Sequence, residues 1–233
     1  MPIPISAVLF LIQSGYPADV VMRVCMNSIN GLDNSYGGPG NPREGSPKFQ
    51  ELMSAIRQLQ SVGGMGMRLK IAKDKQPVVM FLRPAADEAL AVPNRRIREL
   101  LDLDESATEF TVVIGDFPDN NLEVSMLSRS ILQVMVDVAS YIDIPTADAA
   151  EGRAYTPPRT PEQVRLFPPL IAVRTGSTAP GDAFVSVQYR HQWFWIEDRD
   201  RTSKQMLTFL MMLFSLTETS SAQAAPILTV PTR

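Results

Sequence analysis

The chain has 233 residues, of which 45% are hydrophobic and 20% are charged. This composition is typical of a folded globular protein with a substantial core and excludes a disordered chain. Lys and Arg together number 22 against 25 Asp and Glu. Because nucleic-acid binders carry an excess of positive charge, we expect no nucleic-acid partner.

Residues 1–62 are predicted to be helical. Two short helices are expected within residues 5–31, with a tight corner at Gly15 between them. The second begins with a proline in its first turn, which favours a helix start. Asn30-Gly31 is expected to end it.

A loop and a longer helix complete this helical region. Residues 31–45 are dense in Gly, Pro and Asn, a composition typical of loops. Ser46 and Pro47 then have the residue types of a helix cap and first helical position. Apolar residues follow at three- and four-residue steps, and Gly63-Gly64 is expected to end the helix.

Residues 63–143 are predicted to mix strands and helices. Residues 67–72 and 77–83 alternate apolar and polar side chains around a polar turn, which predicts a hairpin. A broad stripe of apolar residues at helical spacing predicts a long helix further on. The expected elements after the hairpin are short helices over residues 85–91 and 93–103, a strand over 109–114 and the long helix over 122–141.

Residues 144–169 are proline-rich and lack periodicity, so we expect a surface connection. A C-terminal hairpin and helix are predicted over residues 170–217. The hairpin pairs residues 170–175 with a strand that runs from residue 183 to 195. Thr202 to Gln205 fits a capping box at the start of the helix.

The long strand of this hairpin supplies the candidate binding residues. Period-two alternation places one set of side chains on a single dry face. Packing in the core is the favoured role of these side chains, and the lining of a ligand pocket or a protein contact is the alternative for the aromatic ones. The dry face comprises Val185, Val187, Tyr189, His191, Trp193 and Trp195, and the last four of these, Tyr189, His191, Trp193 and Trp195, are the candidate binding residues.

The sequence predicts no catalytic residues, no metal site and no cofactor. Cys25 is the single cysteine and lies among apolar residues, which is typical of a buried thiol. His191 is the single histidine, and a hydrolase or transferase that uses it with acids from Glu197 to Asp200 is the less favoured alternative. A position near the start of a helix, where negative charge is favourable, explains these acids better than a role as ligands of a hard cation.

Two apolar segments are too short to span a bilayer. Residues 7–12 and 206–216 both fall well below the roughly 20 apolar residues that a spanning helix needs, so we expect no transmembrane segment in this chain. The second segment is apolar on most sides, which favours a buried helix over an oligomer or membrane contact. Residues 218–233 form a tail that is expected either to be disordered or to add an edge strand and bind a neighbouring subunit.

Together these elements predict one α+β domain over residues 1–233, with a mainly antiparallel sheet of about five strands packed against helices. Hairpins and helices alternate without regular βαβ repetition. This order excludes a doubly wound parallel sheet.

Residues 6–23, SAVLFLIQSGYPADVVMR, and residues 194–219, FWIEDRDRTSKQMLTFLMMLFSLTET, resemble segments of an uncharacterised family of Gram-negative bacterial proteins. That family is usually longer at the N-terminus, where an export or lipoprotein-like segment stands. The resemblance implies a location in the periplasm or cell envelope and peripheral membrane association through an N-terminal anchor missing here. If the chain is complete as given, a cytoplasmic location is expected instead.

The leading hypothesis is therefore a noncatalytic structural or protein-interaction component of a bacterial cell envelope assembly, with a protein partner or a homo-oligomer. The alternative is a module that binds a small ligand or lipid through the aromatic strand at residues 189–195. The absence of catalytic spacing, the apolar C-terminal helix and the resemblance favour the first.

Overall fold

The computed structural model describes residues 2–38, 43–70, 77–84, 87–154 and 160–222. Its largest element is a six-stranded sheet with the order β2-β1-β6-β5-β4-β3. All neighbouring strands run antiparallel except β5 and β6, which are parallel. The strands are β1 (Met26–Ile29), β2 (Leu32–Asp33), β3 (Met65–Leu69), β4 (Val78–Leu82), β5 (Glu109–Ile114) and β6 (Glu123–Ser128).

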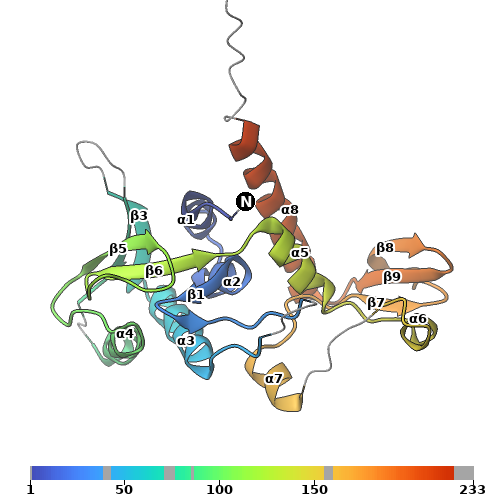
Figure 1. Cartoon of the computed structure of the whole chain (residues 1–233), viewed down its shortest axis with the longest axis horizontal. Coiled ribbons are helices and arrows are strands. Elements are labelled where there is room, and N and C mark those ends of the chain that lie inside the picture. Colours follow the sequence, from blue (N-terminus) through green and yellow to red (C-terminus); the bar gives the residue numbers. More distant parts are fainter. Residues whose placement is uncertain (1, 39–42, 71–76, 85–86, 155–159, 223–233) are drawn as a thin grey trace, which may run out of the picture.

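Helices cover one face of this sheet. In Figure 1, α2 lies between α1 and α3, with α1 in contact with β3 and β4 and α4 in contact with α3. The core between these helices and the sheet consists of fully buried apolar side chains, among them Val8, Leu11, Met22, Phe49, Leu52, Met80, Phe110 and Met126. The helices of the chain are α1 (Ile5–Gln13), α2 (Ala18–Cys25), α3 (Pro47–Ser61), α4 (Glu88–Leu101), α5 (Ile131–Ala139), α6 (Thr146–Ala150), α7 (Pro161–Leu166) and α8 (Arg201–Ala222).

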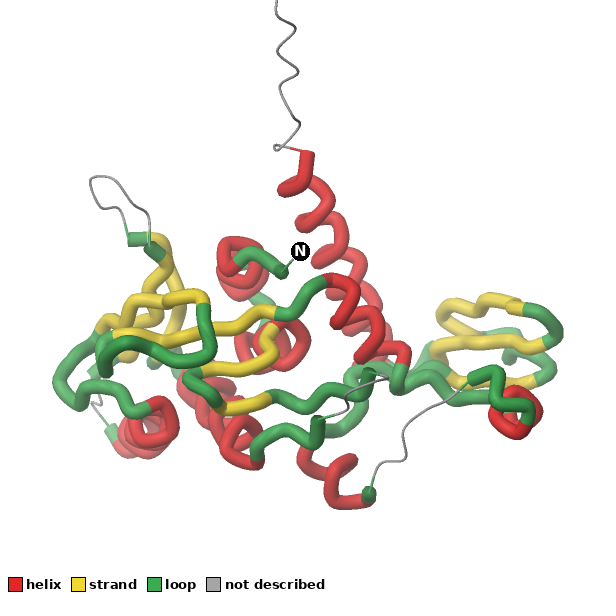
Figure 2. Tube along the Cα trace, viewed as in Figure 1, coloured by secondary structure: helices red, strands yellow, loops and turns green. Residues whose placement is uncertain are grey.

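A second sheet of three strands projects from the side of this body. Its order is β7-β9-β8, with β7 (Arg174–Gly176), β8 (Ala183–Tyr189) and β9 (Gln192–Glu197). Figure 2 shows these strands at one end of the molecule, separated from the six-stranded sheet by loops and by α5 and α8. The long helix α8 follows β9 directly and passes between the two sheets.

The α+β class predicted from the sequence is confirmed, but the number of strands is not. The sheet expected to have about five strands is a mixed sheet of six, and a separate sheet of three accompanies it. The hairpin β3–β4, the strand β5 and the helix α3 with its Ser46 cap and Pro47 all lie where the sequence predicted them. The turn of that hairpin, residues 71–76, lies outside the described residues.

The predicted long helix over residues 122–141 is wrong. Its first half is β6, which pairs in parallel with β5, and only its second half is helical, as α5. Ser130 begins α5 with a capping box, because its hydroxyl accepts from the Gln133 N–H and the Gln133 side chain accepts from the Ser130 N–H. Pairing with β5 therefore overrides the helical spacing of the apolar residues.

Asn30 and Gly31 do not end a helix. The second helix stops at Cys25, and these two residues form the turn of the hairpin β1–β2 with φ angles of 45° and 73°. Positive φ at both positions is the geometry that Asn-Gly favours in two-residue hairpin turns. The Asn30 side chain also donates to the Leu101 carbonyl at 2.7 Å and accepts from the Ser125 N–H at 2.7 Å, so the turn joins the end of α4 to β6.

Two further predictions need correction. Residues 88–101 form the single helix α4 with Pro93 inside it, where two short helices were expected. The connection predicted over residues 144–169 contains α6 and α7, and it ends in the core, because Phe167 is 1% exposed. The tail beyond residue 222 lies outside the described residues.

Candidate protein-interaction surface

The strand predicted from residue 183 to 195 is a hairpin. The chain reverses at Arg190 and His191, so that Tyr189 pairs with Gln192 and Ser186 with Trp195. Arg190 takes a φ of 55°, the positive value that such two-residue loops require at their first position. The turn was missed because neither residue is a glycine or an asparagine.

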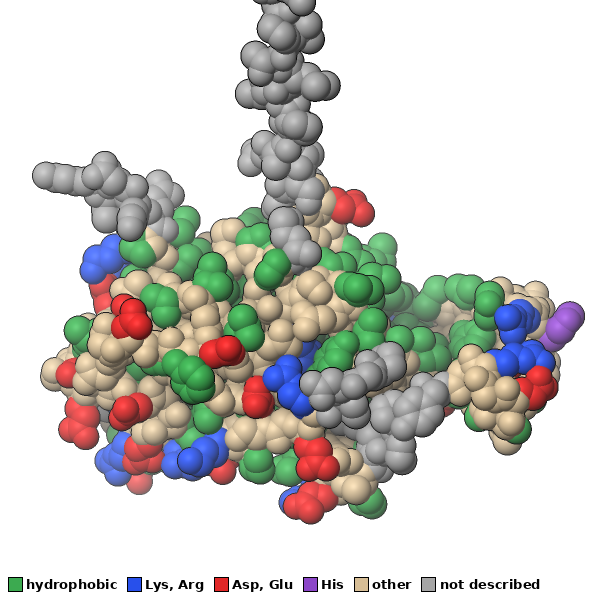
Figure 3. All heavy atoms as spheres, viewed as in Figure 1, with side chains coloured by type: hydrophobic (Ala, Val, Ile, Leu, Met, Phe, Trp, Pro, Cys, Tyr) green, Lys and Arg blue, Asp and Glu red, His purple; other side chains and the backbone are tan. Residues whose placement is uncertain are grey.

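This reversal separates the four candidate binding residues. Residues paired directly across antiparallel strands share a face, so Tyr189 lies on the face of Val185, Val187 and Phe194. Trp193 and Trp195 lie on the opposite face, with Gln188 and Ser186. His191 is exposed in the turn, and the purple side chain in Figure 3 marks it at the far end of the small sheet. The single dry face predicted for all four is wrong.

His191 lies far from the acids between Glu197 and Asp200, with which a catalytic role was considered. Glu197 follows His191 by six positions of nearly extended chain, a span of roughly 20 Å. Asp198 instead accepts from the Lys204 ammonium at 2.8 Å, and Asp200 accepts from the Ser203 N–H at 3.0 Å and hydroxyl at 2.6 Å. These contacts leave His191 without a carboxylate partner for acid–base chemistry in the described part of the chain.

Asp200, rather than Thr202, caps α8. Its carboxylate accepts both hydrogen bonds from Ser203, and these bonds lower the pKa of Asp200 below its usual value. The Ser203 hydroxyl in turn accepts from the Ala172 N–H at 2.8 Å. The predicted Thr202 capping box is therefore wrong, and the start of α8 is tied to the segment that leads into β7.

The outer face of β8 is apolar and exposed. Val185, Val187 and Tyr189 are 37%, 60% and 61% exposed and follow one another along this face. Figure 3 shows hydrophobic side chains along the upper edge of the small sheet and over α8 and α5. A surface of this kind on a folded protein is typical of an interaction site.

The edge of β8 is also open. Strand β9 pairs with β8 on one side only, so the outward backbone groups of β8 face away from the sheet. On the opposite edge, Ile142 bridges Val173 next to β7, and the Asp143 N–H donates to the Val173 carbonyl at 2.9 Å. In the described residues, the edge beside β7 is thus partly covered whereas that of β8 is not.

The sequence of β8 carries neither a charge nor a proline at this edge. Natural sheets block edges with Lys, Pro, inward charges, bulges or short strands, and β8 reads AFVSVQY over seven residues, with a register shift against β9 only between Ala183 and Val185. The short β7 carries Arg174, which contacts Asp143 at 3.4 Å and Glu197 at 3.7 Å. We call the outward edge of β8, together with Val185, Val187 and Tyr189, the β8 surface.

The helix α8 is covered on one side only. Met206, Phe209 and Leu213 are buried against the body, and the Phe209 ring packs edge-on against Tyr16 at 5.2 Å. Met211 is 66% exposed and Met212 is 36% exposed. The described residues therefore leave apolar side chains of α8 uncovered. Leu132 and Met135 of α5 are exposed as well.

A pocket of about 290 Å³ adjoins the β8 surface. Tyr189 and Phe194 line it from the sheet, and Ile142 and Ile144 line it from the segment after α5. Arg153, Arg190, Asp143 and Asp148 also line the pocket. Of the two tryptophans, Trp195 lines a different pocket, of about 310 Å³, together with Asp182, Glu197 and Asp198.

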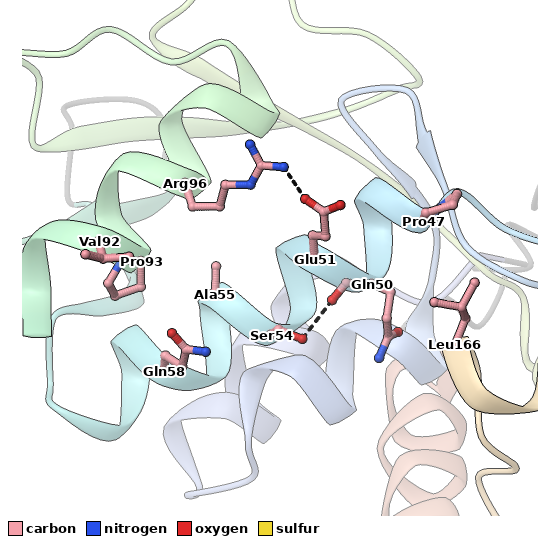
Figure 4. A pocket seen from close by; sticks show the side chains of 10 residues that line it. All are labelled: Pro47, Gln50, Glu51, Ser54, Ala55, Gln58, Val92, Pro93, Arg96 and Leu166. Carbon is pink, nitrogen blue, oxygen red and sulfur yellow. Dashed lines mark hydrogen bonds and ion pairs between the residues drawn. The ribbon is translucent and has the colours of Figure 1, made fainter.

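Another pocket, of about 320 Å³, lies between α3 and α4 (Figure 4). An ion pair between Arg96 and Glu51 crosses its upper side, and Ala55, Val92 and Pro93 form an apolar wall. This pocket could not be predicted from the sequence, because its walls come mainly from two helices that are distant in the chain. Ser54 and Gln58 also line it, and the Ser54 hydroxyl donates to the Gln50 carbonyl at 3.0 Å.

The sequence also gave no sign of a buried ion pair. Arg129 and Asp137 pair at 3.0 Å with side chains that are 1% and 2% exposed. The Gly37 N–H donates to Asp137 at 2.7 Å, and the Arg129 guanidinium donates to the Ser35 carbonyl and lies 5.8 Å from the Tyr36 ring. These contacts fix the loop at residues 35–37 against α5, which is a structural role, although the buried Arg129 Nε has no hydrogen-bond partner among the described residues.

Neither a metal site nor a membrane span is found in the part of the chain that the structure describes. No group of three or more His, Cys, Asp or Glu side chains there is arranged to hold a metal ion. No described helix combines the length and the apolar character needed to cross a bilayer.

Comparisons with known proteins add no relative. No protein-family model, no curated protein and no solved structure matches the chain.

Proposed function

We propose that this protein is a noncatalytic structural or protein-interaction component of a bacterial cell envelope assembly, and that it binds a protein partner through the β8 surface. The observation that carries this proposal is an unprotected edge strand whose exposed face is apolar. An extended segment of a partner can add to such an edge through main-chain hydrogen bonds, with neighbouring apolar side chains supplying affinity.

The envelope location rests on the resemblance of residues 6–23 and 194–219 to Gram-negative envelope proteins. It is testable apart from the interaction. Osmotic shock of cells that express the full-length protein from its own gene should release it with the periplasm or leave it in the membrane pellet. Recovery in the cytoplasmic fraction would contradict the location but not the interaction.

Photo-crosslinking in cells tests the interaction. A photoreactive amino acid in place of Val187, which is 60% exposed on β8, should give adducts with another polypeptide. The matched control is Thr111, which is exposed on the large sheet and belongs to β5, a strand paired on both sides. Adducts at Val187 and few at Thr111 are expected. No adduct at Val187, or the same adducts at both positions, would overturn the proposal.

A small-ligand or lipid module remains the second candidate, and the pocket beside Tyr189 and Phe194 favours it. Its two aromatic rings and opposing charges suit a partly apolar molecule with a charged group. Because Trp193 lies on the other face, tryptophan fluorescence is a poor reporter for this pocket. Thermal shifts over a set of metabolites and lipids should be seen for the wild type and be lost in Tyr189→Ala. The absence of any shift would leave this candidate without support.

A further inference from the structure

We infer that the occupant of the β8 edge is the β8 strand of a second copy of this chain, paired antiparallel about a twofold axis at Ser186. This inference rests on the proposed function, because it names the partner of the same surface. The two three-stranded sheets would join into one sheet with the order β7-β9-β8-β8-β9-β7 across the two copies.

The three central residues of β8 are symmetric about Ser186. In AFVSVQY, Val185 and Val187 flank the central serine, so a twofold axis there places Val185 of each copy opposite Val187 of the other. Ser186 lies opposite its own counterpart, and Val185, Ser186 and Val187, which follow the register shift between Ala183 and Val185, form the centre of the pair. Any other centre leaves residues at the ends of β8 unpaired, which makes this register the one with the most contacts.

Side-chain chemistry agrees with this register. Directly opposite residues share a face, so Val185, Val187 and Tyr189 of both copies lie on one side of the joined sheet and extend its exposed apolar face. β-Branched cross-strand pairs of this kind stabilise antiparallel sheets. Ser186 and Gln188 lie on the other side, where Gln188 of each copy lies opposite Phe184 of the other.

Charge places no obstacle to self-pairing. A twofold axis puts each charged residue of an edge near a like charge of the other copy, which opposes pairing. Strand β8 has no charged residue from Ala183 to Tyr189. The nearest charges beyond the strand are Asp182 before it and Arg190 after it. The antiparallel arrangement brings these opposite charges to the same end of the pair, so they attract.

The position of β8 leaves room for a second copy. Figure 1 shows the small sheet projecting away from the six-stranded sheet, with β8 on the side away from α6. The edge therefore protrudes from the body of the molecule. Twofold pairing also leaves no β8 edge free, so the association stops at a dimer and forms no fibre.

Substitutions that place a charge at the twofold axis test the inference. Sedimentation equilibrium of the full-length protein should show a dimer. Ser186→Lys and Ser186→Glu each place two like charges opposite one another and should each weaken the dimer by about tenfold or more. An equimolar mixture of the two variants should recover the dimer, because the lysine then faces the glutamate. Ser177→Lys, at an exposed serine in the loop after β7, is the matched control and should dimerise as the wild type does.

Circular dichroism of each variant shows whether its fold is retained. Recovery of the dimer in the mixture would show independently that both variants are folded. A wild-type protein that is monomeric at all concentrations overturns the inference. Loss of the dimer in both variants without recovery in the mixture also overturns it, and would identify a different segment, such as the tail after residue 222, as the occupant. If Val187 crosslinks to another protein while sedimentation shows only monomer, the interaction role stands and self-pairing fails.

Discussion

The pair of Arg129 and Asp137 is buried, with side chains that are 1% and 2% exposed. Both charges are almost fully removed from water, which is costly unless each keeps its partner and its hydrogen bonds. Asp137 keeps two donors, Arg129 and the Gly37 N–H. Loss of either charge would leave the other buried and uncompensated.

We therefore expect Asp137→Ala to lower the free energy of unfolding by about 3 to 5 kcal/mol. Asp143→Ala is the matched control, since Asp143 pairs with Arg174 at the surface, where both side chains are about half exposed, and its loss should cost about 1 kcal/mol or less. Urea unfolding followed by circular dichroism measures both values. Equal losses would show that the Arg129 pair is no stronger than a surface pair.

Cys25 gives a second prediction at this scale, which concerns alkaline pH. Burial raises the pKa of its thiol from 9.0 to about 12, because the thiolate is disfavoured away from water. Between these two values only the unfolded chain releases the proton. The stability contributed by the neutral thiol is therefore complete below pH 9 and declines as the pH rises toward 12, by at most about 1.4 kcal/mol per pH unit.

The comparison with Cys25→Ala isolates this effect. Above pH 9 the wild type should lose stability faster with rising pH than the variant does, since the variant has no thiol to ionise. Urea unfolding at a series of pH values on both proteins measures the difference. Parallel pH dependences would contradict a buried neutral thiol.

At the scale of elements, the hairpin turn between β1 and β2 depends on Gly31. Its φ is 73°, and a methyl group there would overlap the Phe117 ring. Gly152 has a similar φ of 67° with nothing near the corresponding position. Both glycines should cost about 1 kcal/mol when replaced by alanine, because alanine is strained at positive φ.

Gly31→Ala should cost at least about 1 kcal/mol more than Gly152→Ala, since only the former also forces a side chain to move. Thermal unfolding of the two variants gives the comparison. An equal loss in both would mean that Phe117, which is 74% exposed, moves aside freely and that the turn needs glycine only for its backbone.

Local signals decided which elements the sequence could predict. Helix α3 has its cap, its first-turn proline and its apolar face within one segment, and the β3–β4 hairpin joins neighbouring strands. Strand β6 has no such signal, because its Leu, Met and Glu residues suit a helix and its pairing with β5 and β1 comes from elsewhere in the chain. The Asn30-Gly31 turn was predictable from its dipeptide but was interpreted as a helix end.

The candidate surface was predictable only in part. The aromatic residues at 189–195 favoured packing in the core, with a ligand pocket or a protein contact as the alternative, whereas Tyr189 is 61% exposed in the structure. The side chains could not be assigned to the two faces of the small sheet, because the turn at Arg190 and His191 contains no glycine to mark it. Once a turn is missed, every residue after it is assigned to the wrong face. The open edge of β8 also depends on strand order, which alternation does not encode.

At the scale of the whole molecule, the small sheet is held to the body by the segment before β7. Phe167, Leu170 and Ile171 are buried, and the Arg23 guanidinium donates to the Pro168 carbonyl at 2.8 Å. Burial of Arg23 lowers its pKa, with desolvation as the main cause. The proline-rich connection thus ends as part of the core rather than as a surface loop.

Phe167→Ala should accordingly lower the free energy of unfolding by about 3 to 5 kcal/mol. Phe184→Ala is the matched control on β8, where the ring is 45% exposed, and should change stability by only about 0.5 kcal/mol. Urea unfolding of both variants provides the measurement. A small effect of Phe167→Ala would mean that the small sheet is attached only loosely.

The pairing of β1 with β6 has a consequence for synthesis on the ribosome. Met26 pairs with Ser128, so the N-terminal strand has only the short β2 beside it until about 100 further residues are made, which takes roughly 5 to 20 s at usual translation rates. During this time the apolar side chains of α1 and α2 have no complete sheet to cover them. The nascent chain is then at its most prone to aggregation, and a chaperone that shields residues 5–29 would act at this stage.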